Sequence, residues 1–146
     1  MAFCAGELGI PVIFASGCET FTRETQVLVA GIETVAVKRG TRTVPGHNLP
    51  EAGCQRHNAA AIHLCPEEAR RRIRAGSRHA LERVRQEKFG LVSLRAPFRR
   101  VTVLRSTEIF PPRARIDERP GSVIALLNQS GPFRNLGFDP LCLEPL

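Results

Sequence analysis

The sequence contains no Trp and no Tyr, and eight Phe are its only large aromatic side chains. This scarcity argues against a surface for single-stranded nucleic acid, because such surfaces stack bases on aromatic rings. No run of about 18 apolar residues is present, which excludes an ordinary membrane-spanning helix and leaves no sign of a membrane partner. The N-terminal residues also lack the basic stretch, apolar core and cleavage site of a signal peptide. Five Cys without a secretion signal predict reduced thiols in a cytoplasmic protein rather than a disulfide framework.

What the sequence does contain is the composition of one globular domain. Of its 146 residues, 42% are hydrophobic and 24% are charged, which is too apolar for a disordered chain. Lys and Arg number 21 against 14 Asp and Glu, so the formal net charge is +7. A basic chain can bind nucleic acid or an anionic membrane surface, but its charge alone establishes neither.

The first part of the chain predicts a strand–helix–strand unit over residues 10–38. Residues 10–16 read IPVIFAS, a short apolar run typical of a buried strand in a parallel sheet. Residues 19–30 have apolar side chains at helical spacing, and Gly31 suits the position after a helix end. Residues 33–38 read ETVAVK, an alternating strand. We therefore expect two parallel neighbouring strands joined by a right-handed crossover.

Later segments complete an α/β fold with a partial parallel sheet. Residues 39–56 are rich in Gly and Pro and predict a long loop. Residues 66–88 predict a long amphipathic helix, with Pro66 at its first position and acidic residues in its first turn. Residues 98–105 read FRRVTVLR and predict one further strand, whereas residues 106–146 hold six of the 11 Pro and predict an irregular tail.

The predicted helix over residues 66–88 carries many Arg and permits two interpretations. One is a face that contacts phosphates, which would make the chain a small basic nucleic-acid-binding module. The other is a solvated face with ion pairs four residues apart, such as Glu67–Arg71 and Glu68–Arg72. No recognised reader motif accompanies the charges, which weighs against nucleic acid as a partner. The helix arginines are Arg70, Arg71, Arg72, Arg74, Arg78, Arg83 and Arg85.

Four residues with metal-binding side chains lie close together in the sequence: Cys54, His57, His63 and Cys65. Thiolate and imidazole groups are the usual ligands of a tetrahedral zinc ion. Their spacing is not that of a known zinc finger or ribbon, and a helix or strand between them would separate the set. The alternative is an ordinary loop whose His side chains are solvated. Unfolding by a chelator would support the zinc interpretation.

Three stretches together resemble the zinc-dependent D-aminopeptidases, the DppA-like metallopeptidases. They are residues 5–12 (AGELGIPV) with the following FASG, residues 33–38 (ETVAVK) and residues 64–69 (LCPEEA). Their order and spacing are similar to the later half of that family, over about residues 1–105. Residues 106–146 do not follow the family pattern and are expected to form a separate Pro-rich tail. The resemblance implies an α/β fold, a ring-like oligomer and zinc-assisted hydrolysis of peptides with an N-terminal D-residue.

The resemblance also places candidate site residues. Glu24 and Lys38 fall at a Glu and a Lys of the family, and Asn58 falls in the stretch that follows; with Glu19 these are the candidates adjacent to substrate. The zinc ligands and catalytic His of the family lie in motifs that would precede Met1, so no catalytic residue and no metal ligand is assigned. Glu7 is a candidate ligand because Gly6-Glu7-Leu8-Gly9 imitates a family motif, although the register places it in a later helix-to-strand turn.

From these residues we expect a truncated D-aminopeptidase-like chain that is inactive by itself and binds no zinc alone. Its partner would be a missing N-terminal half or further copies of the chain, with peptide as the substrate class. The basic nucleic-acid-binding module remains the alternative.

Overall fold

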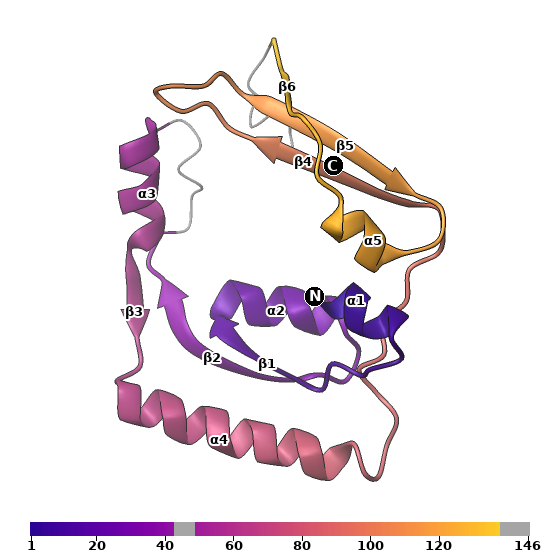
Figure 1. Cartoon of the computed structure of the whole chain (residues 1–146). Coiled ribbons are helices and arrows are strands. Elements are labelled where there is room, and N and C mark those ends of the chain that lie inside the picture. The colour runs from indigo at the N-terminus through magenta and orange to yellow at the C-terminus, as the bar shows by residue number, and fades with distance from the viewer. Residues whose placement is uncertain (43–48, 138–146) are drawn as a thin grey trace. The chain divides into compact units, whose positions relative to one another are not determined.

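The computed structural model describes residues 1–42 and 49–137 (Figure 1). The chain divides into two compact units: the first lies within residues 1–44 and 58–93, and the second contains the remaining described residues. No helix among the described residues is both long and apolar enough to cross a membrane. The regular elements are α1 (Ala2–Glu7), β1 (Phe14–Cys18), α2 (Glu19–Leu28), β2 (Glu33–Gly40), α3 (Glu51–Ala59), β3 (Ala61–His63), α4 (Pro66–Arg83), β4 (Phe98–Leu104), β5 (Arg113–Arg119), α5 (Val123–Asn128) and β6 (Arg134–Asn135).

The first unit is built on a three-stranded sheet with the strand order β1–β2–β3. β1 and β2 are parallel, and Cys18 at the end of β1 lies opposite Lys38. β3 runs antiparallel to β2 and places His63 opposite the same Lys38. A connection as long as α2 allows two consecutive strands to lie side by side in parallel. The α/β class and the strand–helix–strand unit over residues 10–38 are therefore confirmed.

Helices cover both faces of this sheet (Figure 1). Thr34 and Val35 are neighbours in β2, so their side chains point to opposite faces. On one face, Gln26 of α2 donates a hydrogen bond of 2.8 Å from Nε2 to Thr34 Oγ1. On the other face, a Cβ atom added to Gly76 of α4 would lie 2.8 Å from Val35 Cγ2. Glycine at position 76 therefore lets α4 approach the sheet closely.

The core of the first unit is aliphatic and small. Val29, Ile32 and Val92 are buried together, and Phe3 of α1 packs against them. A Cβ atom at Gly6 would overlap the carbonyl oxygen of Val92, so only glycine allows α1 to lie against this segment. The core thus unites the N-terminal helix, the end of α2 and the residues after α4.

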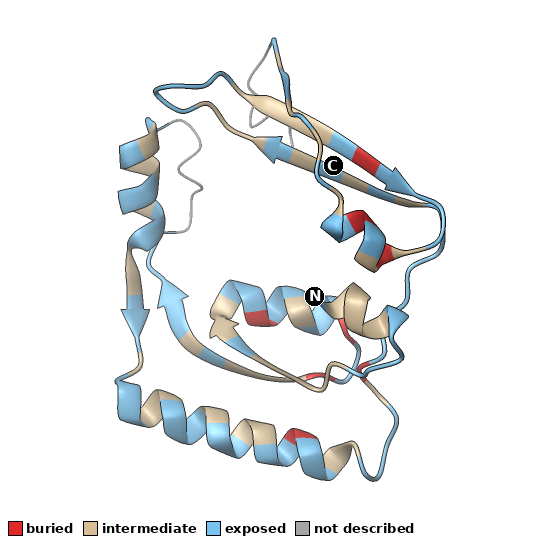
Figure 2. Ribbon diagram, in the orientation of Figure 1, coloured by how far each residue is buried: buried red, intermediate tan, exposed pale blue. Residues whose placement is uncertain are grey.

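The second unit is an antiparallel sheet with the order β4–β5–β6. β4 and β5 pair over seven positions, and β6 adds a short pairing with Arg113 and Ala114. α5 packs against both long strands and buries Val123 and Leu126. Ser122 caps this helix, since its Oγ accepts a hydrogen bond of 3.0 Å from the Ala125 N–H. Figure 2 shows the buried positions of this unit on β5 and α5.

A charged network lies on the face of the β4–β5 pair that α5 contacts. Asp117 is 3% exposed, and its Oδ2 accepts hydrogen bonds from Arg100 Nη2 at 2.6 Å and from Arg115 Nε at 2.9 Å. Arg100 also donates to the carbonyl oxygens of Leu127 and Gln129 and so ties the end of α5 to β4. The Arg100 guanidinium, followed by that of Arg115, holds the pKa of Asp117 below its ordinary value.

Two predicted boundaries before residue 90 were wrong. The predicted loop over residues 39–56 contains the start of α3, which the sequence did not reveal because its apolar residues do not recur at helical spacing. The predicted helix over residues 66–88 ends at Arg83 instead. The Arg83 carbonyl accepts hydrogen bonds from the N–H groups of both Gln86 and Glu87, and residues 84–86 form a turn.

The predicted strand over residues 98–105 is present as β4, but it pairs with β5 rather than joining the parallel sheet. The described part of the expected irregular tail contains β5, α5 and β6. Pro111, Pro112 and Pro120 flank β5 and do not interrupt its pairing with β4. Residues 138–146 of the predicted tail lie outside the described residues, as do residues 43–48 of the predicted loop.

Candidate functional site

The carboxyl ends of β1 and β2 meet at one edge of the first unit's sheet. β1 passes directly into α2, whose first residue is Glu19, and Lys38 lies opposite Cys18 near the end of β2. In open α/β sheets, ligands commonly bind outside the carboxyl ends of the parallel strands. This edge is therefore the expected location of a functional site.

A pocket of about 250 Å³ opens at this edge. Its charged and titratable lining residues are Glu19, Lys38, Arg39 and His63. α2 supplies the carboxylate, β2 supplies the two cations, and β3 supplies the imidazole. The apolar part of the lining includes Val37, Ile62 and Leu64. The pocket thus combines groups of both charges with an apolar surface, which suits a small zwitterionic or peptidic ligand.

Local contacts fix the start of α2 beside this pocket. Cys18 caps the helix, since its Sγ accepts a hydrogen bond of 3.5 Å from the Phe21 N–H. Glu19 Oε1 accepts from Arg23 Nη2 at 2.8 Å, one turn later. The negative charge of Glu19 also stabilises the positive end of the helix dipole. These contacts hold the Glu19 carboxylate at the rim of the pocket.

The structure brings together two of the four candidates adjacent to substrate. Glu19 and Lys38 line the same pocket. Glu24 lies exposed on α2, and Asn58 lies exposed on α3; neither lines this pocket. No observation assigns a role to any of the four, so their place next to substrate stays a prediction.

His63 and Arg39 were not predicted as members of this site. His63 was grouped with the possible zinc ligands, and β3 is only three residues long. A strand this short carries no periodicity that reveals its partner. The pairing of His63 with Lys38 is a long-range contact, and the sequence contains no signal for it.

The possible zinc ligands are distributed over separate elements. Cys54 and His57 lie on α3, His63 lies on β3, and Cys65 precedes α4 as its N-cap. Glu7 is the last residue of α1 and is exposed, before the turn that leads to β1. Across residues 1–42 and 49–137, no three His, Cys, Asp or Glu side chains form a group suited to a metal ion. The described residues therefore do not fit a zinc centre.

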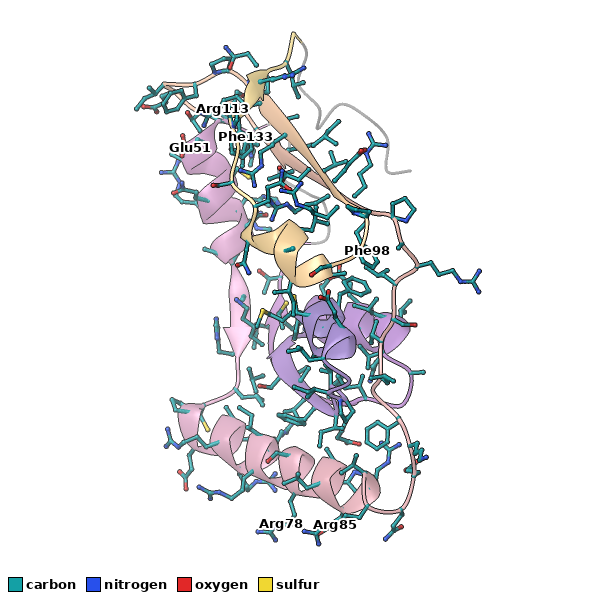
Figure 3. All side chains as sticks on the ribbon, turned by 45° about the vertical axis from the view of Figure 1, so that its right-hand side comes forward. Glu51, Arg78, Arg85, Phe98, Arg113 and Phe133 are labelled. Atoms are coloured by element: carbon teal, nitrogen blue, oxygen red, sulfur yellow. The ribbon has the colours of Figure 1, made fainter. Side chains whose placement is uncertain are left out.

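The Arg-rich helix α4 forms ion pairs within itself and to the sheet. Glu68 pairs with Arg71 at 2.6 Å and with Arg72 at 2.7 Å, and these hydrogen bonds lower the pKa of Glu68 to about 2. The expected Glu68–Arg72 pair is thus present, whereas Arg71 pairs with Glu68 and not with Glu67. Figure 3 shows Arg78 and Arg85 projecting from α4 away from the sheet. Nothing in this arrangement supports nucleic-acid binding over a solvated helix face.

At its other end, α4 is attached to the start of β2. Glu33 Oε2 lies 3.1 Å from His79 Nδ1 and 3.3 Å from Arg83 Nη1. Arg83 also pairs with Glu87 at 2.7 Å and donates to the Gly31 carbonyl. This network positions α4 on the sheet, and we regard it as structural.

Comparison with known proteins identifies the family. A family profile described as D-aminopeptidase matches residues 1–119. This range contains every element of the first unit and continues through β5, past the point at which the sequence resemblance ended. Neither the curated proteins nor the solved structures give a significant match. Since the matched range is well over half of the 146 residues, the chain belongs to the D-aminopeptidase family of peptidases.

Proposed function

We propose that this chain takes part in the hydrolysis of peptides with an N-terminal D-residue, and that the pocket at the carboxyl ends of β1 and β2 positions the peptide. The family match over residues 1–119 carries the proposal. The pocket adds a suitable place, because it lies where α/β sheets commonly bind ligands and is lined by groups of both charges.

In this proposal two charged residues of the pocket, Glu19 and Lys38, have simple roles. The Glu19 carboxylate binds the α-ammonium group at the peptide N-terminus, and Lys38 binds a carbonyl or carboxylate oxygen farther along. Both contacts are charge-assisted hydrogen bonds, which are stronger than neutral ones. The apolar residues Val37 and Leu64 would contact the side chain of the bound residue. Glu19 and Lys38 position the substrate and perform no bond-breaking step.

The family's reaction uses zinc, which polarises the scissile carbonyl and activates water. The described residues do not form a metal centre, so they do not supply the zinc ligands of the family. We therefore propose that the chain by itself binds no catalytic zinc and has no peptidase activity. A second polypeptide that carries those ligands, or assembly of several chains, would complete the active site.

The first test measures metal content and turnover on the purified chain, with D-alanyl and L-alanyl amides and added zinc. We expect neither stoichiometric zinc nor turnover. Stoichiometric zinc together with D-selective turnover would show that the chain assembles a complete site, and the proposed inactivity would be wrong.

The second test measures binding of D-alanyl-D-alanine by titration calorimetry. Lys38→Ala and Glu19→Gln should each weaken binding about tenfold, the usual size of one charge-assisted hydrogen bond. Glu82→Gln is the matched control, because it changes an exposed carboxylate of α4 that does not line the pocket. This control should bind like the wild type. Equal effects of all three substitutions would refute the assigned roles.

A further inference from the structure

The first half of β2 has one edge that no strand of the described residues covers. β3 pairs with β2 only over Lys38–Gly40, and Figure 1 shows it beside the arrowhead of β2. The Glu33 N–H donates to the Ile13 carbonyl, so Glu33 directs its main-chain groups toward the β1 side. Main-chain groups of consecutive residues in a strand point to opposite edges. Thr34 and Ala36 therefore direct theirs away from β1, because the register with β1 is regular as far as Ala36.

The main-chain groups of Thr34 and Ala36 at this edge are available for pairing. Within residues 1–42 and 49–137, no loop or turn donates a main-chain hydrogen bond to them or accepts one from them. β3 occupies the same edge farther along, and the Leu64 N–H makes the last contact there, with the Val37 carbonyl. Free N–H and C=O groups on a strand edge are a template for another extended chain. Peptides bind to many proteins by adding a strand in this way.

A groove of about 490 Å³ follows this edge. Four consecutive residues of β2 line one side of it, and α4 lines the other side. Ala75 and Gly76 have the smallest side chains of the α4 side and leave space beside the strand edge. The groove therefore offers main-chain partners on one side and the side chains of α4 on the other. The complete lining is Glu33, Thr34, Val35, Ala36, Arg71, Arg72, Ala75, Gly76 and His79.

The charge of the α4 side favours an acidic partner. α4 contains six Arg and three Glu. Arg71 and Arg72 line the groove with side chains 68% and 50% exposed, and they share the single carboxylate of Glu68. The carboxylate of Glu33 is engaged elsewhere, since it lies 3.3 Å from Arg83 Nη1. A carboxylate that enters the groove therefore meets exposed guanidinium groups that have not been neutralised one for one.

We propose that this groove binds an extended acidic peptide segment, which adds a strand to the free edge of β2. The main chain of the segment pairs with Thr34 and Ala36, and a carboxylate side chain directed toward α4 binds Arg71 or Arg72. The proposal does not rest on the proposed peptidase function. The groove and the pocket beside Glu19 share only Ala36 in their linings, and strand addition requires no peptide N-terminus.

The test uses the peptide acetyl-Thr-Val-Glu-Val-Thr-amide as the probe. Its blocked N-terminus has no ammonium group, so it lacks the contact assigned to Glu19 in the peptidase proposal. The probe is titrated into the full chain labelled with nitrogen-15, and hydrogen exchange of the Thr34 and Ala36 amides reports pairing at this edge. We expect saturable binding, and we expect exchange of both amides to slow about tenfold or more because their N–H groups become hydrogen-bonded.

Two altered peptides separate the main-chain contribution from that of the carboxylate. Replacing the Glu of the probe by Gln removes the charge-assisted hydrogen bond to the arginines and should weaken binding about tenfold. Methylating the three central amide nitrogens of the probe removes the donors needed for strand pairing. This methylated peptide keeps the carboxylate, and we expect it not to bind.

Two variants of α4 test the role assigned to its arginines. Arg72→Gln leaves Glu68 bound to Arg71 by two hydrogen bonds, so the helix keeps that ion pair. It should weaken the Glu peptide about fivefold and leave binding of the Gln peptide unchanged. Arg78→Gln is the matched control, because Arg78 is exposed and projects away from the sheet (Figure 3). Circular dichroism of each variant verifies that it is folded.

Four outcomes would overturn the proposal. Absence of saturable binding of the Glu peptide to the folded wild type would exclude the site. Equal binding of the methylated peptide would show attraction between side chains without strand addition. Equal losses from Arg72→Gln and Arg78→Gln would show general attraction by the positive charge of the chain. Exchange of the Thr34 and Ala36 amides that slows with chain concentration, in the absence of peptide, would show that a second copy of the chain occupies this edge.

Discussion

The two units of this chain use arginine in different ways. In the first unit, Arg71 and Arg72 are exposed residues of α4 and pair with Glu68 of the same helix. In the second unit, Arg100 and Arg115 come from different strands and meet over the buried Asp117. The first arrangement is local, since its partners are three or four residues apart. The second depends on the pairing of β4 with β5.

This difference shows how each unit is stabilised. The first unit buries Val29, Ile32 and Val92 between its elements, and its charged residues mostly line the exterior. The second unit buries a charged network together with Val123 and Leu126, while Val101 and Ile116 on the other face of its sheet are more than half exposed. We therefore expect the stability of the first unit to depend most on close backbone packing. The stability of the second unit should depend most on the Asp117 network.

The largest expected effect is that of Gly6→Ala in the first unit. The added Cβ atom would overlap the Val92 carbonyl oxygen, and a backbone atom cannot move aside as a flexible side chain can. We expect a loss of about 3 kcal/mol or more in the free energy of unfolding, measured by urea denaturation. Hydrogen exchange should accelerate more in β1 and β2 than in β4 and β5. Gly40→Ala is the matched control, because nothing lies within 4 Å of its added Cβ atom.

The next largest effect is expected from Asp117→Asn in the second unit. The substitution leaves Arg100 and Arg115 together without their counter-charge, which strongly destabilises an ion-pair network of low exposure. The urea midpoint should fall, and exchange should accelerate first in β4, β5 and α5. Glu118→Gln provides the comparison, since Glu118 is exposed and lies 3.6 Å from Arg99. A similar loss for both variants would show that burial of the Asp117 network is unimportant.

The stability of the wild-type chain should fall in acid because of the same Asp117 network. The folded-state pKa of Asp117 lies below its ordinary 3.8, so its contribution to stability is complete above that value and is lost as the pH falls through the folded pKa. Glu68 acts in the same direction between 4.5 and about 2. The urea midpoint should therefore fall in this acid range. Asp117→Asn should show a shallower fall than the wild type, and an unchanged slope would contradict the assignment.

The smallest effect is expected from Arg23→Gln on the surface of α2. Arg23 pairs with Glu19 four residues earlier, and its side chain is 74% exposed. Pairs of this kind contribute about 0.3–0.5 kcal/mol, because water and salt screen them. The loss should shrink when the urea titration is repeated in high salt. A loss of unfolding free energy as large as that caused by Asp117→Asn would show that local and cross-strand ion pairs do not differ in their contribution to stability.

Much of the first unit could be predicted from the sequence, because its signals are local. The apolar run at residues 10–16, the helix signals before Gly31 and the alternation at residues 33–38 each specify an element by itself. The helix that begins at Pro66 carries its own start signals. The boundaries were less accurate: α3 was missed for lack of periodicity, and α4 ends at Arg83, earlier than expected.

The candidate site was only partly predictable. Glu19 and Lys38 were selected by resemblance to the family, and their place in one pocket follows from the parallel pairing of β1 with β2. His63 joins them through β3, whose three residues give no sequence signal. The buried network of Arg100, Arg115 and Asp117 in the second unit was not predicted at all, because the residues after β4 were expected to be irregular.

The sequence by itself determined the α/β class, the strand–helix–strand unit, the amphipathic Arg-rich helix and the resemblance to D-aminopeptidases. Local periodicity, caps and short motifs carry these features within a few turns of chain. Only the tertiary structure decided that β4 pairs with β5, that Asp117 lies between two arginines, and that Lys38 lies beside His63. Such contacts join residues distant in the sequence, and their free energy arises only when strands pair and exclude water.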